Sequence, residues 1–143
     1  VAEIGVGTII DLTNGVTPEK VVRFEVPGEP RSKQRPRVTR RGTFTPKETI
    51  EAERHVRDCW RATGEQPFQY QLLVDITFYN GNRRRRDLDN MAKLVLDALN
   101  KEAYEDDVQV IELNVRKIFT ERERARSIIT LREMIEPPAE TML

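Results

Sequence analysis

The hydrophobic period of this chain switches between residues 70 and 101, and this switch constrains the fold more than any other feature. In residues 70–79 (YQLLVDITFY) apolar side chains hold every second position, which is typical of a β-strand with one fully buried face. From Leu88 the apolar residues recur at steps of three and four, which predicts an amphipathic helix over residues 88–101. We therefore predict a central strand, a polar loop and a helix that packs back onto the sheet.

Three more strands are predicted from the same kind of pattern. Residues 21–26 alternate between apolar and charged side chains, which indicates a half-buried strand. Residues 108–119 and 126–132 also have strand patterns, and the charged run TERERA between them is expected to close a hairpin. Asp75 lies on the mixed face of the 70–79 strand, where it either pairs with a neighbouring strand or joins an acidic site.

A second helix is predicted from its start signals. Thr45 is a candidate N-cap, Pro46 suits the first helical position, and Glu48 completes a capping box. The helix is expected to end near Arg61. Strands and helices together predict an α+β fold, with a mixed or antiparallel sheet of about four to five strands covered by two main helices.

The length and composition indicate one domain. Residues 1–143 are enough for one hydrophobic core, with residues 1–20 as an extra N-terminal segment of unknown role, in which Asn14-Gly15 signals a turn. The lone His55 and Trp60 are expected to have structural roles. The chain has one cysteine, no signal-peptide pattern and no stretch of the ~20 apolar residues that a membrane span needs, so we expect a cytoplasmic protein without a membrane partner.

Positive charge is concentrated in two stretches of a chain whose formal net charge is zero. Residues 31–41 hold six Lys and Arg side chains and no acid, and residues 83–86 are four consecutive arginines. Because the prolines favour an extended backbone, Lys33, Arg35 and Arg37 are expected to point to one side. Such patches suit a polyanion, so phosphate contact is the expected role and a solvated loop is the alternative.

Carboxylates stand at both ends of the predicted helix 88–101. Asp87 and Asp89 lie at its start, where Asp89 or the neighbouring Asn90 is a candidate cap, and an acidic pair follows its end. Capping does not explain why four arginines directly precede the first two acids. Carboxylate ligands alone select hard cations such as Mg²⁺ or Mn²⁺, so this combination indicates metal-assisted chemistry on phosphate.

The distance between the two acidic pairs depends on how the chain returns after the helix. A helix of about fourteen residues spans ~21 Å, so the chain must turn back along it unless the partner acid comes from a second subunit. Either Asp106 or Asp107 can then be the inward ligand. Lys93, one turn after Asp89, either stabilises charge on phosphate or forms an ordinary ion pair four residues away. Asp97 is expected to be a surface or capping partner.

In ordered combination these motifs resemble the RusA-type Holliday-junction resolvases of bacteria and their phages. The shared features are P-x-S-K-Q-R-P-R, R-R-R-D-L-D-N, a lysine four residues after the second aspartate, D-A-L, and Y-E-D-D-x-Q-V. The resemblance spans residues 22–132 and implies a RusA-like fold and a homodimer that makes paired, symmetric nicks across a four-way DNA junction during recombination and repair. It also implies Mg²⁺ as cofactor, with Mn²⁺ as a substitute, in a bacterial or phage-infected cell.

The resemblance also implies residue roles. Asp87, Asp89 and Asp107 correspond to the metal-binding catalytic acids, and Lys93 to the catalytic lysine. The predicted DNA-binding residues are Lys33, Arg35, Arg37, Arg84, Arg85 and Arg86. The alternative hypothesis is a nucleic-acid-binding module without catalysis, in which the acids are caps and ion-pair partners.

Overall fold

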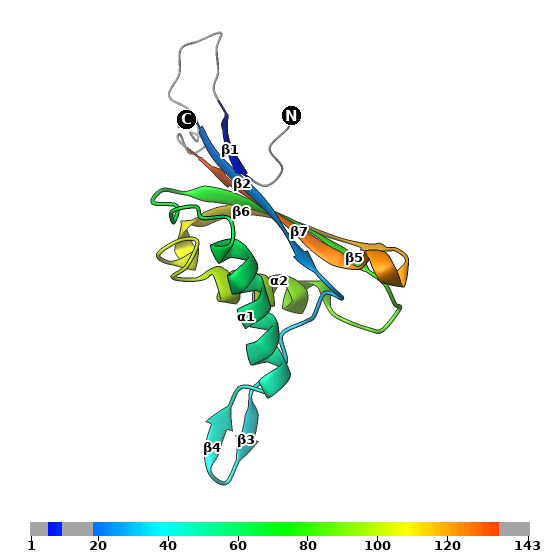
Figure 1. Ribbon diagram of the computed structural model, residues 1–143. Coiled ribbons are helices and arrows are strands. Elements are labelled where there is room, and N and C mark those ends of the chain that lie inside the picture. The colour runs from blue at the N-terminus through cyan, green and yellow to red at the C-terminus, as the bar shows by residue number, and fades with distance from the viewer. Residues whose placement is uncertain (1–5, 10–18, 135–143) are drawn as a thin grey trace, which may run out of the picture.

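The main sheet has five strands and carries both long helices on the same face, in a computed structural model that describes residues 6–9 and 19–134 (Figure 1). The sheet strands are β1 (Val6–Ile9), β2 (Glu19–Pro27), β5 (Leu72–Asn80), β6 (Val110–Phe119) and β7 (Arg126–Glu133). The helices are α1 (Lys47–Arg61) and α2 (Leu88–Leu99), and the short 3-10 turns are η1 (Asp107–Gln109) and η2 (Arg122–Arg124). A separate hairpin is formed by β3 (Arg37–Thr39) and β4 (Gly42–Phe44). This arrangement confirms the predicted α+β class. Neither long helix of the described residues is apolar and extended enough to cross a membrane.

The strand order is β1-β2-β7-β5-β6, and the β5–β6 pair is parallel while the other pairs are antiparallel. The predicted hairpin between residues 108–119 and 126–132 is therefore wrong, because β5 separates β6 from β7. Helix α2 makes the crossover that two parallel neighbours need. In β7, Ile129 and Leu131 are fully buried between β2 and β5, which makes it an inner strand, while β6 lies at the edge. The hydrophobic pattern along one strand does not specify which strand pairs with it.

The centre of the core lies on β5, as its alternation predicts. Ile76 and Phe78 are buried beneath the helices, where Met91 of α2 is also buried. Trp60 of α1 packs edge-on against Phe24, with ring centroids 5.9 Å apart. The apolar stripes of both helices thus cover one face of the sheet, and the expected core position of Trp60 is confirmed.

Two residues with more than one predicted role are structural. Asp75 lies on the open face of the sheet and forms an ion pair with Arg116 of β6 at 2.9 Å, so it pairs with a neighbouring strand. The Nε2 atom of His55 lies 2.8 Å from the carbonyl oxygen of Pro27 and ties α1 to the end of β2. The predicted turn at Asn14-Gly15 lies outside the described residues.

The start of α1 differs from the predicted capping box. Pro46 has an extended backbone (φ −56°, ψ 145°) and takes the N-cap position, and its carbonyl oxygen accepts a bond from the Thr49 amide at 3.1 Å. Thr45 is thus one residue too early to cap the helix, which begins at Lys47 and ends at Arg61 as expected. The fixed φ of proline is compatible with either position, so the sequence does not decide between them.

The start of α2 also differs from the predicted caps. Asp87 holds the N-cap position with an extended backbone, and its side chain makes no capping bond. Asp89 and Asn90 are already inside the first turn, because the helix begins at Leu88. The helix ends at Leu99, two residues earlier than predicted, and the shorter helix changes where the second acidic pair comes to lie.

Candidate active site

An open hollow of about 520 Å³ runs along one side of α2, between that helix and β6. Its floor is apolar and its rim carries three aspartates and a lysine. The lining residues are Leu88, Asp89, Ala92, Lys93, Leu96, Asp97, Asp107, Leu113 and Val115. The four-residue spacing of Asp89, Lys93 and Asp97 puts these three side chains on one side of the helix. The hollow thus brings together Asp89 and Asp107, two of the three predicted metal-binding acids, with Lys93.

A tight reversal after α2 brings Asp107 back to this hollow. Lys101 has the left-handed backbone (φ 65°) that reverses the chain, and the Ala103 carbonyl oxygen accepts a bond from the Phe68 amide at 2.7 Å. Tyr104 is fully buried, and its hydroxyl donates to the Leu96 carbonyl oxygen at 2.8 Å. The short segment is therefore sufficient for the return, because α2 is shorter than the pattern indicates and Tyr104 anchors the chain against it.

Asp106 and Asp107 have different surroundings. The Asp106 carboxylate caps η1 by accepting a bond from the Val108 amide at 3.0 Å, which is the main reason that its pKa is lowered. The Asp107 side chain lines the hollow, and its pKa is raised, chiefly by its interaction with Asp106, then by desolvation and by the charge of Asp97, against an opposing effect of Lys93. Of these two acids, Asp107 is the one directed at the hollow.

Of the two acids at the start of α2, Asp89 lines the same groove and Asp87 does not. Asp89 is exposed in the first turn and accepts a bond from the Asn90 amide at 2.9 Å, while Asp87 is exposed at the N-cap. Asp89 is eight residues before Asp97, close to which Asp107 lies, and eight residues of helix span ~12 Å. Within the described residues no three His, Cys, Asp or Glu side chains gather closely enough to enclose a metal ion. Asp89, Asp97 and Asp107 thus line one groove without forming a closed cage.

Lys93 points into the hollow without an ion-pair partner among residues 19–134. The alternative expected for Lys93, an ion pair four residues away, is therefore not formed within these residues. Asp97 instead pairs with Lys33, which also lies 3.3 Å from Glu53. Burial lowers the pKa of Lys33, but these two acids outweigh that effect and the net pKa is raised. Lys33 is therefore engaged inside the protein, and Lys93 is the exposed cation of the hollow.

The match to a known family covers all of these elements. The model of the family described as endodeoxyribonuclease RusA matches residues 27–132, which is most of the chain. The chain belongs to this family. The matched range begins at the end of β2 and ends within β7, and it contains both helices, the arginine run and both acidic pairs. Among curated proteins, none matches the chain.

The four arginines of this RusA protein have unlike environments. The Arg83 guanidinium lies 4.3 Å from the centre of the Phe119 ring. Arg84 and Arg85 are exposed, and neither forms an ion pair in the described part of the chain. Arg86 turns inward: its side chain is 9% exposed and pairs with Glu29 at 3.1 Å. The run therefore keeps three exposed arginines, of which Arg83 lies over Phe119, and the DNA-contact role of all the predicted cations stays a prediction.

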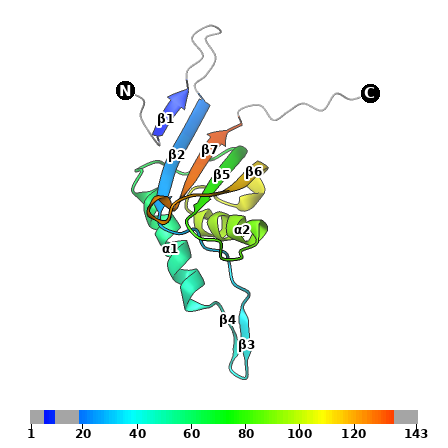
Figure 2. The same ribbon diagram turned by 90° about the vertical axis from the view of Figure 1, so that its right-hand side faces the viewer.

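The hairpin β3–β4 carries the other outward cations of the RusA domain. It projects beyond the start of α1, away from the sheet (Figures 1 and 2). Gly42 (φ 121°) closes the turn at Arg40-Arg41-Gly42 in a backbone region that only glycine adopts readily. Arg35 and Arg37 are exposed, as are the two arginines of the turn. The prediction that Lys33, Arg35 and Arg37 point to one side is wrong, because Lys33 turns to Glu53 of α1 and Asp97 of α2 while Arg35 and Arg37 are exposed.

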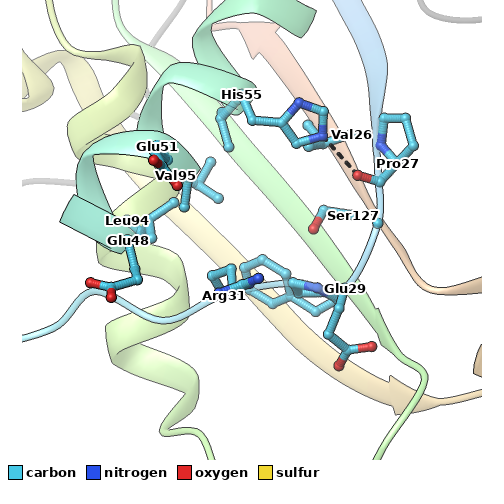
Figure 3. A pocket seen from close by; sticks show the side chains of 15 residues that line it. Val26, Pro27, Glu29, Arg31, Glu48, Glu51, His55, Leu94, Val95 and Ser127 are labelled. Carbon is cyan, nitrogen blue, oxygen red and sulfur yellow. Dashed lines mark hydrogen bonds between the residues drawn. The ribbon is translucent and has the colours of Figure 1, made fainter.

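A second pocket of about 330 Å³ lies between α1, α2 and the segment after β2 (Figure 3). Its inner wall is apolar, with Val26, Leu94 and Val95, and His55 on its rim is bonded to the Pro27 carbonyl oxygen. None of the predicted site acids lines it. The groove along α2 is thus the better candidate for the active site of this RusA protein.

Proposed function

We propose that this chain is a Mg²⁺-dependent, structure-selective endodeoxyribonuclease that resolves Holliday junctions by paired, symmetric cleavage. One observation carries the proposal: in a chain of the RusA family, Asp89 and Lys93 of α2 line a single groove with Asp107, which lies in η1 after the end of that helix. Carboxylates and a cation on one groove suit phosphodiester hydrolysis, in which charge on the phosphate must be stabilised.

The donor set of the groove suits Mg²⁺. This ion usually keeps several waters and binds through one or two carboxylates and the oxygens of its phosphate substrate, so a closed cage of three acids is not required. The pKa of Asp107 is raised chiefly by its side-chain interaction with Asp106 and by desolvation, and the negative charges of Asp106 and Asp97 add to the shift, so a cation beside Asp107 would offset those charges. Asp89 and Asp107 in the groove, and Asp87 at the helix start, are the carboxylates available to the ion. When bound, the ion polarises a phosphoryl oxygen and lowers the pKa of a bound water, and Mn²⁺ can replace it.

The residues of the chain itself bind and orient the DNA in this proposal. Lys93 faces the groove and offsets negative charge on the phosphate that is cut. Arg84 and Arg85 hold the flanking phosphates, and the hairpin β3–β4 contacts the backbone farther away. A homodimer would carry two such grooves related by a two-fold axis, which matches the symmetry of a four-way junction and accounts for paired nicks.

The proposed activity is tested with labelled four-way junction, linear duplex and flap DNA, each with and without Mg²⁺. We expect paired, symmetric nicks in the junction in the presence of Mg²⁺, and little cleavage of the duplex. Binding of the junction without any Mg²⁺- or Mn²⁺-dependent product would instead support the second candidate, a nucleic-acid-binding module without catalysis. The open spacing of the acids along the groove is the observation that keeps this alternative in view.

The hairpin is expected to contribute a phosphate contact through its turn. Replacing Arg41 with glutamine removes one exposed cation, so the slope of log Kobs against log salt concentration should become less steep by about 0.9 for each lost phosphate contact. Fluorescence anisotropy of a labelled junction over a salt series measures this slope. Arg54→Gln, an exposed arginine in the middle of α1, is the matched control and should leave the slope unchanged. Equal slopes for both variants would contradict a phosphate contact at the turn.

A further inference from the structure

Arg86, the last arginine of the run, is held from two sides. Its guanidinium Nη1 donates to Oε2 of Glu29 at 3.1 Å, and its carbonyl oxygen accepts a bond from Nζ of Lys117 at 2.7 Å. Glu29 follows β2 and Lys117 lies on β6, so the contacts come from segments far apart in the sequence. The carbonyl group of Arg86 forms the peptide bond to Asp87. The two contacts therefore fix the residue directly before the first aspartate of the site.

Glu29 also fixes the beginning of the arginine loop. Its Oε1 accepts a bond from the Gly81 amide at 2.8 Å, and its Oε2 lies 3.3 Å from Nδ2 of Asn80. Asn82 adds a contact from the same loop, because its Oδ1 lies 3.3 Å from Nη1 of Arg86. In Figure 3 the Glu29 carboxylate points away from His55. One carboxylate thus ties the end of β5 to the start of α2.

The charge pattern of the loop explains why such an anchor is needed. Consecutive arginines repel one another, and the exposed Arg84 and Arg85 do not hold the loop in one path. An arginine as little exposed as Arg86 is stable in its place only while its charge is paired and hydrogen-bonded. Removal of the Glu29 charge would leave a buried cation without its partner and would release the loop.

We propose that Glu29 and Lys117 are positioning residues that lock Arg86 and so hold Asp87 and the first turn of α2 in the orientation that phosphodiester cleavage needs. This inference rests on the proposed function. In it, Arg86 acts inward through Glu29 instead of on a DNA phosphate. Residues that orient metal-binding side chains typically change metal affinity or activity by about 10- to 100-fold when they are lost.

The first test compares cleavage with binding. Glu29→Gln keeps the size of the side chain but removes its charge, Lys117→Met removes the donor, and Lys117→Arg restores a donor. In single-turnover cleavage of a four-way junction with Mg²⁺, the first two variants should lose about 10- to 100-fold in rate. Their Kd for the junction in EDTA should stay unchanged, and Lys117→Arg should recover most of the rate.

Arg116→Met is the matched control for this test. Arg116 is the neighbour of Lys117 on β6 but faces the opposite side of the sheet, where it pairs with Asp75. Its loss should leave the cleavage rate unchanged. Wild-type rates in Glu29→Gln and Lys117→Met would overturn the proposal. So would a loss of junction affinity as large as the loss of rate, since that result would make these residues part of the DNA-binding surface.

The second test does not depend on activity. Hydrogen exchange of the full chain, without DNA or metal, reports the opening of the Met91 amide, which donates to the Asp87 carbonyl oxygen at 3.0 Å. This amide should exchange faster in Glu29→Gln and Lys117→Met than in Arg116→Met, while amides shared by β2 and β7 keep their protection. Equal exchange in all three variants would contradict the proposal that Glu29 and Lys117 fix Arg86. If the wild-type chain cuts no junction but this exchange pattern is found, the proposed nuclease function fails and the positioning role of Glu29 and Lys117 stands.

Discussion

Asp107→Asn is expected to abolish junction cleavage while leaving junction binding intact. The substitution keeps the size of the side chain but removes a carboxylate that lines the groove and that is proposed to hold the metal ion. Because a metal ion contributes several kcal/mol to charge stabilisation, and each 1.36 kcal/mol is tenfold in rate, the loss should be about 10³-fold or more. Binding should not weaken, since the variant removes negative charge near the DNA. Single-turnover cleavage and binding in EDTA measure the two effects.

Asp106→Asn is the matched control for this prediction. Asn is as good an N-cap as Asp, so the bond from the Val108 amide and the turn η1 should both persist. Cleavage by this variant should stay close to the wild-type rate. A large loss in Asp106→Asn together with near-normal cleavage in Asp107→Asn would show that the inward acid has been assigned to the wrong residue. Full activity in both variants, and in Asp89→Asn, would exclude metal-dependent catalysis in this groove.

Tyr104→Ala is expected to cause the largest loss of stability among single substitutions in the turn after α2. Tyr104 is 0% exposed, and truncation of a buried aromatic side chain to alanine typically costs about 3–5 kcal/mol because it leaves a cavity. Tyr104→Phe should cost only about 1 kcal/mol, the usual net contribution of one hydrogen bond. The Leu96 carbonyl oxygen would still accept the Asn100 amide at 3.0 Å. Urea unfolding measures both free energies.

Tyr70→Ala provides the control for Tyr104→Ala. Tyr70 is 65% exposed just before β5, and surface substitutions usually change stability by no more than about 0.5 kcal/mol. If Tyr104→Ala were no more destabilised than Tyr70→Ala, the anchor that returns the chain toward the groove would not be the buried tyrosine. A graded order of Ala, Phe and wild type at position 104 would support both its burial and its hydrogen bond.

Much of the fold was predictable because local physics determines it. Alternation from Leu72 to Phe78 predicts β5, and the steps of three and four after Leu88 predict α2, since these periods report which side of an element is buried. The turn at Arg40-Arg41-Gly42 was predictable for a similar reason, because a glycine is needed where φ is positive. The exact helix starts were not, because Thr45, Asp89 and their neighbours offer several caps of similar free energy.

The family was also predictable from the sequence, because its motifs are runs of neighbouring residues whose order does not depend on the fold. The R-R-R-D-L-D-N and Y-E-D-D-x-Q-V segments indicate the RusA family, and the family match over residues 27–132 confirms it. The same segments did not decide between Asp106 and Asp107. That choice follows from η1, in which one carboxylate must cap the turn while the next one points into the groove.

Which residues far apart in the chain pair with each other was decided by the tertiary structure alone. Lys33 reaches Asp97 across 64 residues, and Arg86 reaches Glu29 across 57, so neither pair leaves a local pattern in the sequence. The position of β6 at the edge of the sheet has the same cause, because period reports burial and not the identity of the neighbouring strand. Composition and hydrophobic period thus determine which residues are buried or charged and where the chain reverses direction. Only packing decides which cations form ion pairs inside the protein and which remain exposed at its surface.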